Sequence, residues 1–436
     1  MPTLSIRAEA IAALLAAAVP AQAKLTPAET RMSATVDAEY ERSVALLQKL
    51  VDQNSGTMNL PGVTAVGRMM RAELEPLGFT VTWRPQDAVK RAGHLIAVKR
   101  GRPGAKKLLL IGHLDTVFEQ DSPFQKFVRR GEVAEGPGAG DDKGGMVVML
   151  AALRAMQAAG TLKDADISIM LSGDEEDAGD PRTASRTDLV AMGKVADVAL
   201  DFEGLVVEDG RDMGSIARRS SNGWTLTTTG KTGHSSLIFT PDYGDGAINE
   251  LARVLAAFRT TLPEPNLTFN TGLVAGGSSA ALDADRVRAS AAGKGNIIPS
   301  TAIARGDFRT LSPEQTARVK AKMLAIVAQH APGTGATLTF DDGAYPAMAP
   351  TPGNKALLDA LNGVNADLGL PTMAALDPLK RGAGDISFVS DDVDGLVGLG
   401  TASHGDHAPG ETVDLDSIKR QAKRAAILMT RLSSAR

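Results

Sequence analysis

The chain has 436 residues, of which 43% are hydrophobic and 22% charged, and its formal net charge is −4. This balance is typical of a globular protein long enough for two domains, and the small net charge and 4% aromatic content argue against a nucleic-acid or membrane partner. The chain has no cysteine, so disulfides and thiolate metal sites are excluded, and any zinc must be bound by His, Asp and Glu.

The first 23 residues have the pattern of a secretory signal peptide. Arg7 precedes a short apolar run from Ile11 to Val19, and Ala21-Gln22-Ala23 matches an A-x-A cleavage site. The run is too short to span a bilayer. The pattern predicts that residues 1–23 are removed and that the mature protein is periplasmic or secreted; a frayed Ala-rich helix is the alternative.

After Lys24 the chain alternates between predicted strands and helices. Helical spacing of apolar residues predicts helices over 35–52, 63–77 and 146–159. Short apolar runs predict strands over 79–83, 95–98, 108–111, 167–171 and 198–202. Alternation of this kind favours an α/β domain with a mostly parallel, buried sheet, which we expect over residues 24–215.

The pattern changes near residue 216. Strands predicted at 224–229, 267–274, 286–292, 301–308 and 336–340 enclose helices over 246–259 and 312–329, the second capped by Ser312 before a proline. This β-α-β-β-α-β order, with one hairpin extended, is typical of a ferredoxin-like α+β domain. We predict that residues 216–345 form an inserted domain and that residues 346–436 complete the first domain.

Three groups of chemically active side chains follow predicted strands. His113 and Asp115 lie two residues apart at a strand end, so they share one face, and Asp115 is placed to accept the second ring N–H of a metal-bound His113. Asp174-Glu175-Glu176 and Asp201-Phe202-Glu203 follow the next two strands. A divalent cation would relieve the repulsion between neighbouring carboxylates and let one of them act as a base.

Two further groups lie in glycine-rich segments. The segment 136–145 carries Asp141 and Asp142; such loops also bind phosphate, but two adjacent acids favour a cation. The segment 403–411, after the apolar run 396–399, carries His404 and His407. We expect all five groups to follow strands of the same sheet and to meet in one pocket, since α/β folds bind ligands at the carboxyl ends of their strands.

The motifs G-H-L-D-T-V, G-P-G-A-G-D-D-K-G-G, S-G-D-E-E, D-F-E-G and H-A-P-G-E resemble those of the M20 metallopeptidase family over nearly the whole mature chain. Within it, the chain is most similar to the glutamate carboxypeptidase (carboxypeptidase G-like) branch and its amidohydrolase relatives. The resemblance implies two zinc ions per chain, replaceable by Co²⁺ or Mn²⁺, with these ligands: His113, Asp141 as the bridge, Glu176, Glu203 and His407. His404 is the alternative to His407, which fits H-x-P-x-E.

The resemblance also implies further roles. Glu175 would be the general base for a water held between the metals, with Asp115 orienting His113, while Asp142 would shape the loop or meet solvent. The inserted domain would be a lid or dimerisation domain, with His234 stabilising the oxyanion, often across a homodimer interface. Asn296 and Arg309 match substrate-binding positions, and a structural salt bridge is the alternative for Arg309. Glutamate-specific relatives place an arginine where this chain has Asp341-Asp342, so we expect a substrate carboxylate to be repelled there.

The expected activity is hydrolysis of an amide or peptide bond next to a C-terminal amino acid, as in a carboxypeptidase or an N-acyl-amino-acid amidase. The substrate would be a small peptide or an N-acyl amino acid, and no membrane partner is expected after signal cleavage. A biosynthetic deacylase of the same family is the alternative, which the export signal disfavours. A non-catalytic metal-binding paralogue is disfavoured because Glu175 is present. His94 and His330 match no motif and are expected to be structural.

Overall fold

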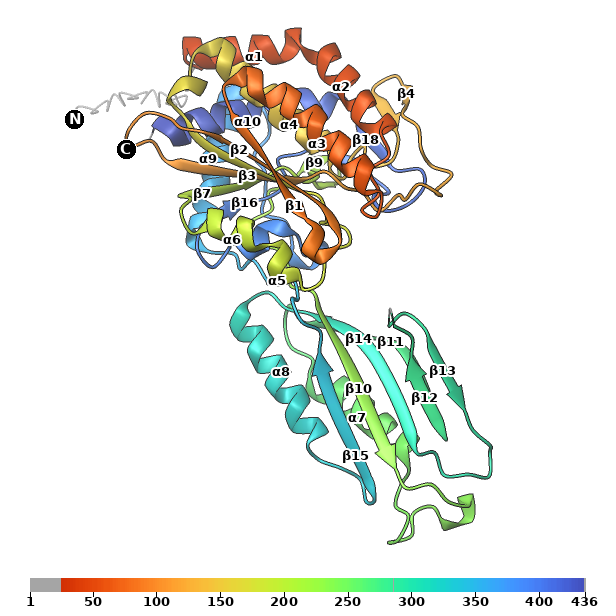
Figure 1. The fold of residues 1–436 in the computed structure, drawn as a ribbon. Helices are drawn as coiled ribbons and strands as arrows, with labels where there is room; N and C mark the ends of the chain where they lie inside the picture. The colour runs from red at the N-terminus through yellow and green to blue at the C-terminus, as the bar shows by residue number, and fades with distance from the viewer. Residues whose placement is uncertain (1–24, 285, 435–436) are drawn as a thin grey trace, which may run out of the picture.

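The computed structural model describes residues 25–284 and 286–434, so the predicted signal peptide over 1–23 lies outside the described residues and stays a prediction. Within the described residues the chain forms two bodies, a catalytic domain and an inserted domain, joined by two connections (Figure 1). None of the described helices is long and apolar enough to cross a membrane.

The catalytic domain is built on a six-stranded sheet, and the prediction of a mostly parallel sheet is confirmed. Its central strands β6, β3, β7 and β16 are parallel, whereas β1 and β2 add an antiparallel edge. In sheet order the strands are β1 (Thr80–Gln86), β2 (Arg91–Lys99), β6 (Asp166–Ser172), β3 (Lys107–His113), β7 (Val198–Asp201) and β16 (Gly395–Leu396).

Both faces of this sheet are covered by helices (Figure 1). Side chains alternate across a strand, so Leu108 and Leu110 of β3 enter one apolar core while Leu109 and Ile111 enter the other. The helices are α1 (Pro27–Ala38), α2 (Tyr40–Asp52), α3 (Leu60–Leu74), α4 (Lys143–Ala159), α5 (Arg182–Ser185), α6 (Thr187–Gly193), α9 (Pro352–Leu368) and α10 (Asp416–Ser434). Burial on both faces explains why the central strands are almost continuously apolar.

The single helix predicted over 35–52 is wrong: the chain forms two helices, α1 and α2, that meet at Glu39. α1 begins upstream of the predicted start, where Thr26 caps it in a capping box with Glu29. Each helix buries its own apolar stripe, with Val36 on α1 and Leu47 on α2, so a helical period alone does not reveal the change of direction between them.

Two smaller sheets lie beside the main one in the catalytic domain. The first has the order β17-β18-β5-β4, and the second pairs β8 with β9. Their strands are β4 (Val128–Arg130), β5 (Val133–Glu135), β8 (Val207–Glu208), β9 (Arg211–Asp212), β17 (Ser403–His404) and β18 (Thr412–Asp414). The first of these sheets matters for the site, because it brings together segments that are more than 250 residues apart.

The inserted domain has the predicted ferredoxin-like arrangement. An antiparallel sheet of order β11-β14-β10-β15 packs against α7 and α8 around the buried side chains of Trp224, Phe258 and Phe308. Its elements are β10 (Asn222–Gly230), α7 (Ala247–Thr261), β11 (Thr268–Gly277), β12 (Ser279–Leu282), β13 (Ala289–Ala292), β14 (Thr301–Arg309), α8 (Pro313–Val327) and β15 (Thr334–Phe340). The strand predicted over 286–292 is only half of a separate β12-β13 hairpin.

Candidate functional site

Three of the predicted groups lie at the carboxyl ends of neighbouring parallel strands. His113 ends β3 opposite Ser172 of β6, and Ile111 of β3 lies opposite Asp201 of β7. The residues that follow these strands, Glu175 and Glu203 among them, therefore reach the same edge of the sheet. This placement agrees with the rule that α/β sheets bind ligands beyond their strand ends.

Of the other two groups, the segment 403–411 follows β16 of the main sheet as expected, whereas the Asp141 segment does not, which corrects the expectation that all five groups follow strands of one sheet. Asp141 follows β5, and His407 lies between β17 and β18 of the small sheet. Glu411 ties these two segments together: its buried carboxylate accepts N–H groups from Gly138, Gly140 and Asp141 at 3.2, 2.7 and 3.1 Å. The Asp141 loop is thus fixed by the segment that carries His407.

The helix α4 begins directly after this loop, and two residues at its start, Gly145 and the N-cap Asp142, allow its close approach to the sheet. Gly145 lies so near the backbone of Phe202 that a Cβ atom would be 1.9 Å from the Phe202 carbonyl oxygen. Asp142 is fully buried and its Oδ2 accepts the backbone N–H of His113 at 3.2 Å. Asp142 therefore shapes the loop, and the alternative that it meets solvent is wrong.

Asp141 lies between two imidazole rings. Its Oδ1 is 2.9 Å from Nε2 of His113, and its Oδ2 is 3.0 Å from Nε2 of His407. Burial alone would raise the pKa of the Asp141 carboxyl, but the contacts with both histidines outweigh it and hold that pKa well below the usual range. One carboxylate oxygen facing each imidazole is the arrangement expected of a ligand that bridges two cations.

Glu176 completes the cluster. Its Oε2 is 3.2 Å from Nε2 of His407, and ligand atoms of His113, Asp141 and Glu176 all lie within 4.8 Å of one another. Imidazole and carboxylate groups so close together are a donor set that fits zinc, cobalt or manganese. Of the two candidate histidines, His407 contacts Asp141, whereas the exposed His404 lines the neighbouring cavity.

Asp115 is buried behind His113, as its spacing predicts. Nδ1 of His113 is 3.1 Å from the Asp115 carbonyl oxygen and 3.4 Å from its Oδ1. The same carboxylate accepts the hydroxyl of Thr57 at 2.6 Å and the backbone N–H groups of Glu175 and Glu176, both at 3.1 Å. Asp115 therefore fixes both the His113 ring and the turn that follows β6.

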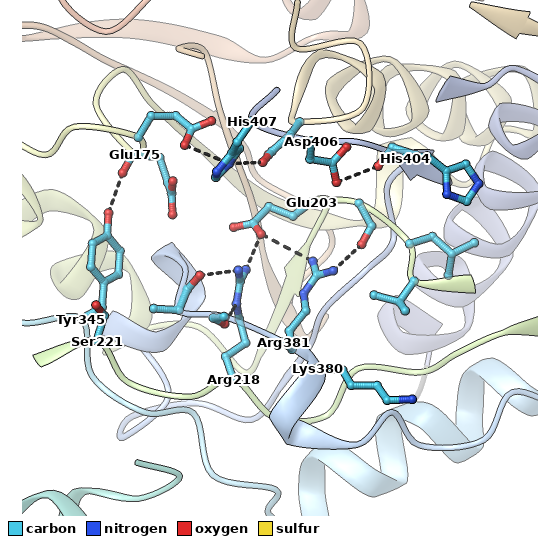
Figure 2. A pocket seen from close by; sticks show the side chains of 18 of the residues that line it. Glu175, Glu203, Arg218, Ser221, Tyr345, Lys380, Arg381, His404, Asp406 and His407 are labelled. Atoms are coloured by element: carbon cyan, nitrogen blue, oxygen red, sulfur yellow. Dashed lines mark hydrogen bonds and ion pairs between the residues drawn. The ribbon is translucent and has the colours of Figure 1, made fainter. Parts of the chain in front are cut away.

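Glu203 lies outside the three-residue cluster. Its Oε2 is 2.5 Å from the Arg218 guanidinium and 3.5 Å from that of Arg381, as Figure 2 shows. Arg218 also lies 3.3 Å from Asp201. The part of Glu203 as a metal ligand stays a prediction, and the two arginines are site residues that sequence reasoning missed. The only local signal for Arg381 is its place beside Lys380, before the small residues Gly382-Ala383-Gly384.

Asp174 turns away from the site into a buried network that the sequence did not reveal. Arg186, which is fully buried, lies 2.5 Å from Asp174 and 2.7 Å from Asp385, and both acids are also buried. Asp385 accepts in addition the hydroxyl of Ser172, the last residue of β6. His94 is buried nearby with its Nε2 2.9 Å from the Ser185 carbonyl oxygen, a structural position as expected.

Glu175 points into a cavity of about 600 Å³ between the cluster and the inserted domain. Burial raises the pKa of the Glu175 carboxyl well above its ordinary value, and the charge of Glu203 adds to this effect. The cavity is also lined by Arg309 and by three basic side chains that Figure 2 labels, which are Arg218, Lys380 and Arg381. These four residues, called the basic wall below, share the cavity with five acidic side chains, which are those of Asp141, Glu175, Glu176, Glu203 and Asp406.

The inserted-domain candidates divide between two places. Arg309, at the end of β14, lines the cavity. His234 and Asn296 are exposed and lie beside each other, with the N–H of Ser235 donating to the Asn296 carbonyl oxygen at 2.9 Å. The loop that carries His234 follows β10 at the end of the inserted domain farthest from the catalytic domain (Figure 1). The structure therefore does not bring His234 or Asn296 to the cluster of their own chain.

Asp341, one of the two acidic residues expected to repel a substrate carboxylate, makes two ion pairs within the inserted domain. It pairs with Arg305 at 2.8 Å and with Arg286 at 2.9 Å on the sheet of the inserted domain. Neither Asp341 nor Asp342 lines the cavity. Because the charge of Asp341 is offset by two guanidinium groups and neither acid lines the cavity, the structure gives no support to the expected repulsion of a substrate carboxylate, which stays a prediction.

Curated relatives share sequence with the chain. Carboxypeptidase G2 of Pseudomonas sp. (strain RS-16) is 31% identical over 313 residues, which are 70% of this chain and 69% of the relative. Succinyl-diaminopimelate desuccinylase of Novosphingobium aromaticivorans is 34% identical over 224 residues, 49% of this chain and 56% of the relative.

Solved structures share the fold. The aminopeptidase PepT of Bacillus cereus superposes with a TM-score of 0.72 at 16% identity, covering 91% of this chain and 99% of that one. The YXEP protein of Bacillus subtilis, described as a dinuclear metal binding peptidase, has a TM-score of 0.62 at 17% identity with the same coverage. At these identities the likeness establishes the fold alone.

The sequence profile of peptidase family M20/M25/M40 matches residues 109–431, which is most of the chain and includes every predicted metal ligand. The match agrees with the two-domain fold and with the cluster around Asp141. The chain therefore belongs to peptidase family M20/M25/M40 and is a metal-dependent hydrolase of that family.

Proposed function

We propose that the chain is a two-zinc hydrolase that cleaves the amide or peptide bond next to a C-terminal amino acid, as a carboxypeptidase or an N-acyl-amino-acid amidase. The observation that carries the proposal is the Asp141 carboxylate, which presents one oxygen to His113 and the other to His407 beside the cavity that holds Glu175. We also propose that the protein acts in the periplasm or outside the cell, from the pattern of residues 1–23.

The donor set decides which residues would hold the metals. His113 and Glu203 would serve one ion, His407 and Glu176 the other, with Asp141 shared between them. When bound, divalent cations polarise the scissile carbonyl and acidify a water molecule. Zinc suits imidazole and carboxylate donors, although cobalt or manganese would also be accepted. The dinuclear YXEP protein of the same fold supports the stoichiometry.

The chain's own residues would carry the proton. Glu175 takes a proton from the attacking water on its carboxylate and later returns it to the leaving nitrogen, so that it ends each turnover unprotonated. Burial raises the pKa of Glu175, which makes its ionised carboxylate a stronger base and suits it to the first of these steps. Asp115 holds Nδ1 of His113 and leaves Nε2 for the metal.

The basic wall of the cavity indicates the substrate class. Arg309 is partly exposed at the cavity and can meet the terminal carboxylate of a substrate through paired N–H donors. His234 and Asn296 would act on the site of a second protomer in a homodimer, since they lie far from the cluster of their own chain. A small peptide or an N-acyl amino acid meets these requirements, and the similarity to carboxypeptidase G2 agrees with them.

A biosynthetic-type deacylase is the second candidate function. The similarity to succinyl-diaminopimelate desuccinylases, whose name specifies removal of a succinyl group, favours it, as does the same basic wall. A panel of dipeptides, N-benzoyl amino acids and N-succinyl amino acids distinguishes the two. Faster cleavage of the N-succinyl amino acids than of dipeptides and N-benzoyl amino acids with the same C-terminal residue would support the deacylase. A requirement for a free terminal carboxylate, with little dependence on the acyl group, supports the carboxypeptidase.

The central test is Glu175→Gln. We expect two zinc ions per chain to remain and turnover to fall by about 10²–10⁴-fold, the usual contribution of a general base. Glu75→Gln, which changes a half-exposed glutamate that directly follows α3 and does not line the cavity, is the matched control and should leave turnover unchanged. Activity near the wild-type level in Glu175→Gln, or fewer than two metals in fully metallated protein, contradicts the proposal.

A further inference from the structure

The two connections between the domains form a short antiparallel ribbon. Ser221 and Tyr345 exchange both backbone hydrogen bonds, at 3.0 and 3.1 Å, and Arg218 and Met348 do the same at 3.0 and 2.9 Å. The outgoing and returning chains are therefore held side by side where they leave the catalytic domain. A side chain carried on this ribbon has a position fixed by four backbone hydrogen bonds.

The returning chain delivers the hydroxyl group of Tyr345 to the site. This hydroxyl donates to the backbone carbonyl oxygen of Glu175 at 2.7 Å, and Figure 2 shows the contact. The ring is 9% exposed and lies edge-on to Phe388 at 5.1 Å, with the Arg182 guanidinium 4.6 Å from its centre. Burial raises the pKa of the Tyr345 phenol well above its ordinary value, so the group stays a donor.

The backbone of Glu175 is thereby held at both ends. Asp115 accepts its N–H at 3.1 Å, and Tyr345 donates to its carbonyl at 2.7 Å. The preceding residue, Asp174, is fixed by the buried Arg186, which also donates to the Tyr345 hydroxyl at 3.2 Å. Because the main chain of Glu175 is fixed in this way, its carboxylate can move only by rotation about the side-chain bonds.

The outgoing chain makes a parallel contribution. Arg218, opposite Met348 in the ribbon, lies 2.5 Å from the Glu203 carboxylate and 3.3 Å from Asp201. Each strand of the ribbon thus places one polar side chain against an acidic loop that follows a strand of the main sheet. The ribbon is more than a covalent link between domains, because its side chains meet the loops that carry two site residues.

We propose that Tyr345 is a positioning residue for the reaction: its hydroxyl, carried on the interdomain ribbon, holds the main chain of Glu175 so that the carboxylate faces the reacting atoms. Tyr345 acts through Glu175 and transfers no proton itself. The proposal rests on the role of Glu175 as general base in the proposed function. A displaced base loses rate because proton transfer requires hydrogen-bond distance in the transition state.

The test is Tyr345→Phe, which removes the hydroxyl and keeps the ring that packs on Phe388 and Arg182. We expect kcat to fall about five- to tenfold, as for the loss of one hydrogen bond that orients a catalytic group. KM and metal content should match the wild type, and the melting temperature should fall by at most a few degrees, since Arg186 also loses one hydrogen-bond partner. An unchanged kcat, or a raised KM with an unchanged kcat, overturns the proposal, since the second result would make Tyr345 a substrate-binding residue.

Tyr40→Phe is the matched control. The Tyr40 hydroxyl also donates to an acidic residue's oxygen, that of Glu132 at 2.6 Å, and a cation, Lys419, also lies over its ring at 4.5 Å. Tyr40 lies on α2 and lines no part of the cavity. Its substitution should leave kcat and KM unchanged. An equal loss of kcat in both variants would mean that the loss at Tyr345 is not specific to the site, and would overturn the proposal.

A double variant separates this inference from the proposed function. If Tyr345 acts through Glu175, adding Tyr345→Phe to Glu175→Gln should lower the remaining turnover by less than about twofold. A further five- to tenfold loss in that background overturns the positioning role. If Glu175→Gln alone is fully active, the proposed function fails; if Glu175→Gln is inactive and Tyr345→Phe is fully active, only this inference fails.

Discussion

The catalytic and inserted domains bury their ion pairs to different depths: the catalytic domain has pairs in which both partners are buried, whereas the inserted domain leaves the basic partner at least partly exposed, even beside the buried Glu250. The catalytic domain buries charged groups completely, as in the Arg186 pairs with Asp174 and Asp385. The inserted domain keeps an apolar core around Trp224 and places ion pairs such as Glu264–Arg318 nearer the surface. Both domains use the same elements of secondary structure, so the difference lies in what each has to hold in place.

The difference indicates a division of labour. Metal ligands and a general base need fixed positions, and carboxylates held at fixed positions out of water need buried partners. The inserted domain instead carries His234 and Asn296 on exposed loops, where they are available to a second molecule. The catalytic domain thus holds charged side chains at fixed positions, and the inserted domain exposes side chains far from the cluster of its own chain.

The largest effect expected from this comparison is on stability. Arg186→Met should lower the free energy of unfolding by about 3–5 kcal/mol, because it leaves two buried carboxylates without their cation. Arg318→Met, in the half-exposed pair of the inserted domain, should cost less than about 1 kcal/mol. Urea denaturation of both variants measures the difference. Equal losses would show that the two domains do not differ in the way they use charge.

The next effect concerns the exposed side chains. In a homodimer, His234→Ala should lower kcat by about 100-fold if the imidazole stabilises the oxyanion of a partner site, while metal content stays constant. His330→Ala is the control within the same domain, since His330 only approaches Glu250, at 3.6 Å. Mixing His234→Ala chains with Glu175→Gln chains should restore activity through hybrid dimers. A monomer with full activity would contradict the role of His234 at the site of a partner protomer.

The smallest effect is on the acid stability of the inserted domain. Hydrogen bonding to Arg318, followed by that to Lys322, lowers the pKa of Glu264 to about 2. A lowered folded-state pKa stabilises the protein above the ordinary glutamate value, and the contribution is lost as pH falls from about 4.5 towards about 2. Glu264→Gln should therefore cost about 1 kcal/mol at pH 7 and almost nothing at pH 2. A loss independent of pH, measured by urea denaturation, would contradict this.

The sequence was sufficient for the features that depend on local pattern. Short apolar runs located strands such as β3, and the residues at or directly after the ends of β3, β6 and β7 include His113, Glu175 and Glu203. The carboxyl ends of parallel strands meet at one edge, so this part of the site could be predicted without coordinates. The inserted fold was predictable for the same reason, as period-2 and period-3.6 patterns alternate clearly there.

The partners that hold those residues were not predictable from local pattern. Arg186 lies 199 residues from Asp385, and Tyr345 lies 170 residues from Glu175, so these contacts depend on where the whole chain folds. The same holds for Glu411, whose contact with the Asp141 loop follows from the pairing of β18 with β5. From sequence alone, a charged residue that belongs to no motif is predicted to lie on the protein surface, and only its neighbours in the fold show that it is buried.

The paired connections have a consequence for how such a protein can be built and altered. Residues that exchange both backbone hydrogen bonds, as Ser221 and Tyr345 do, have Cα atoms about 5.5 Å apart. A hairpin turn of about two residues closes a gap of that size. The segment 222–344 therefore occupies the place of a hairpin loop. Replacing it with another folded domain, or with a short turn, should leave the strands that carry His113 and Glu175 in place.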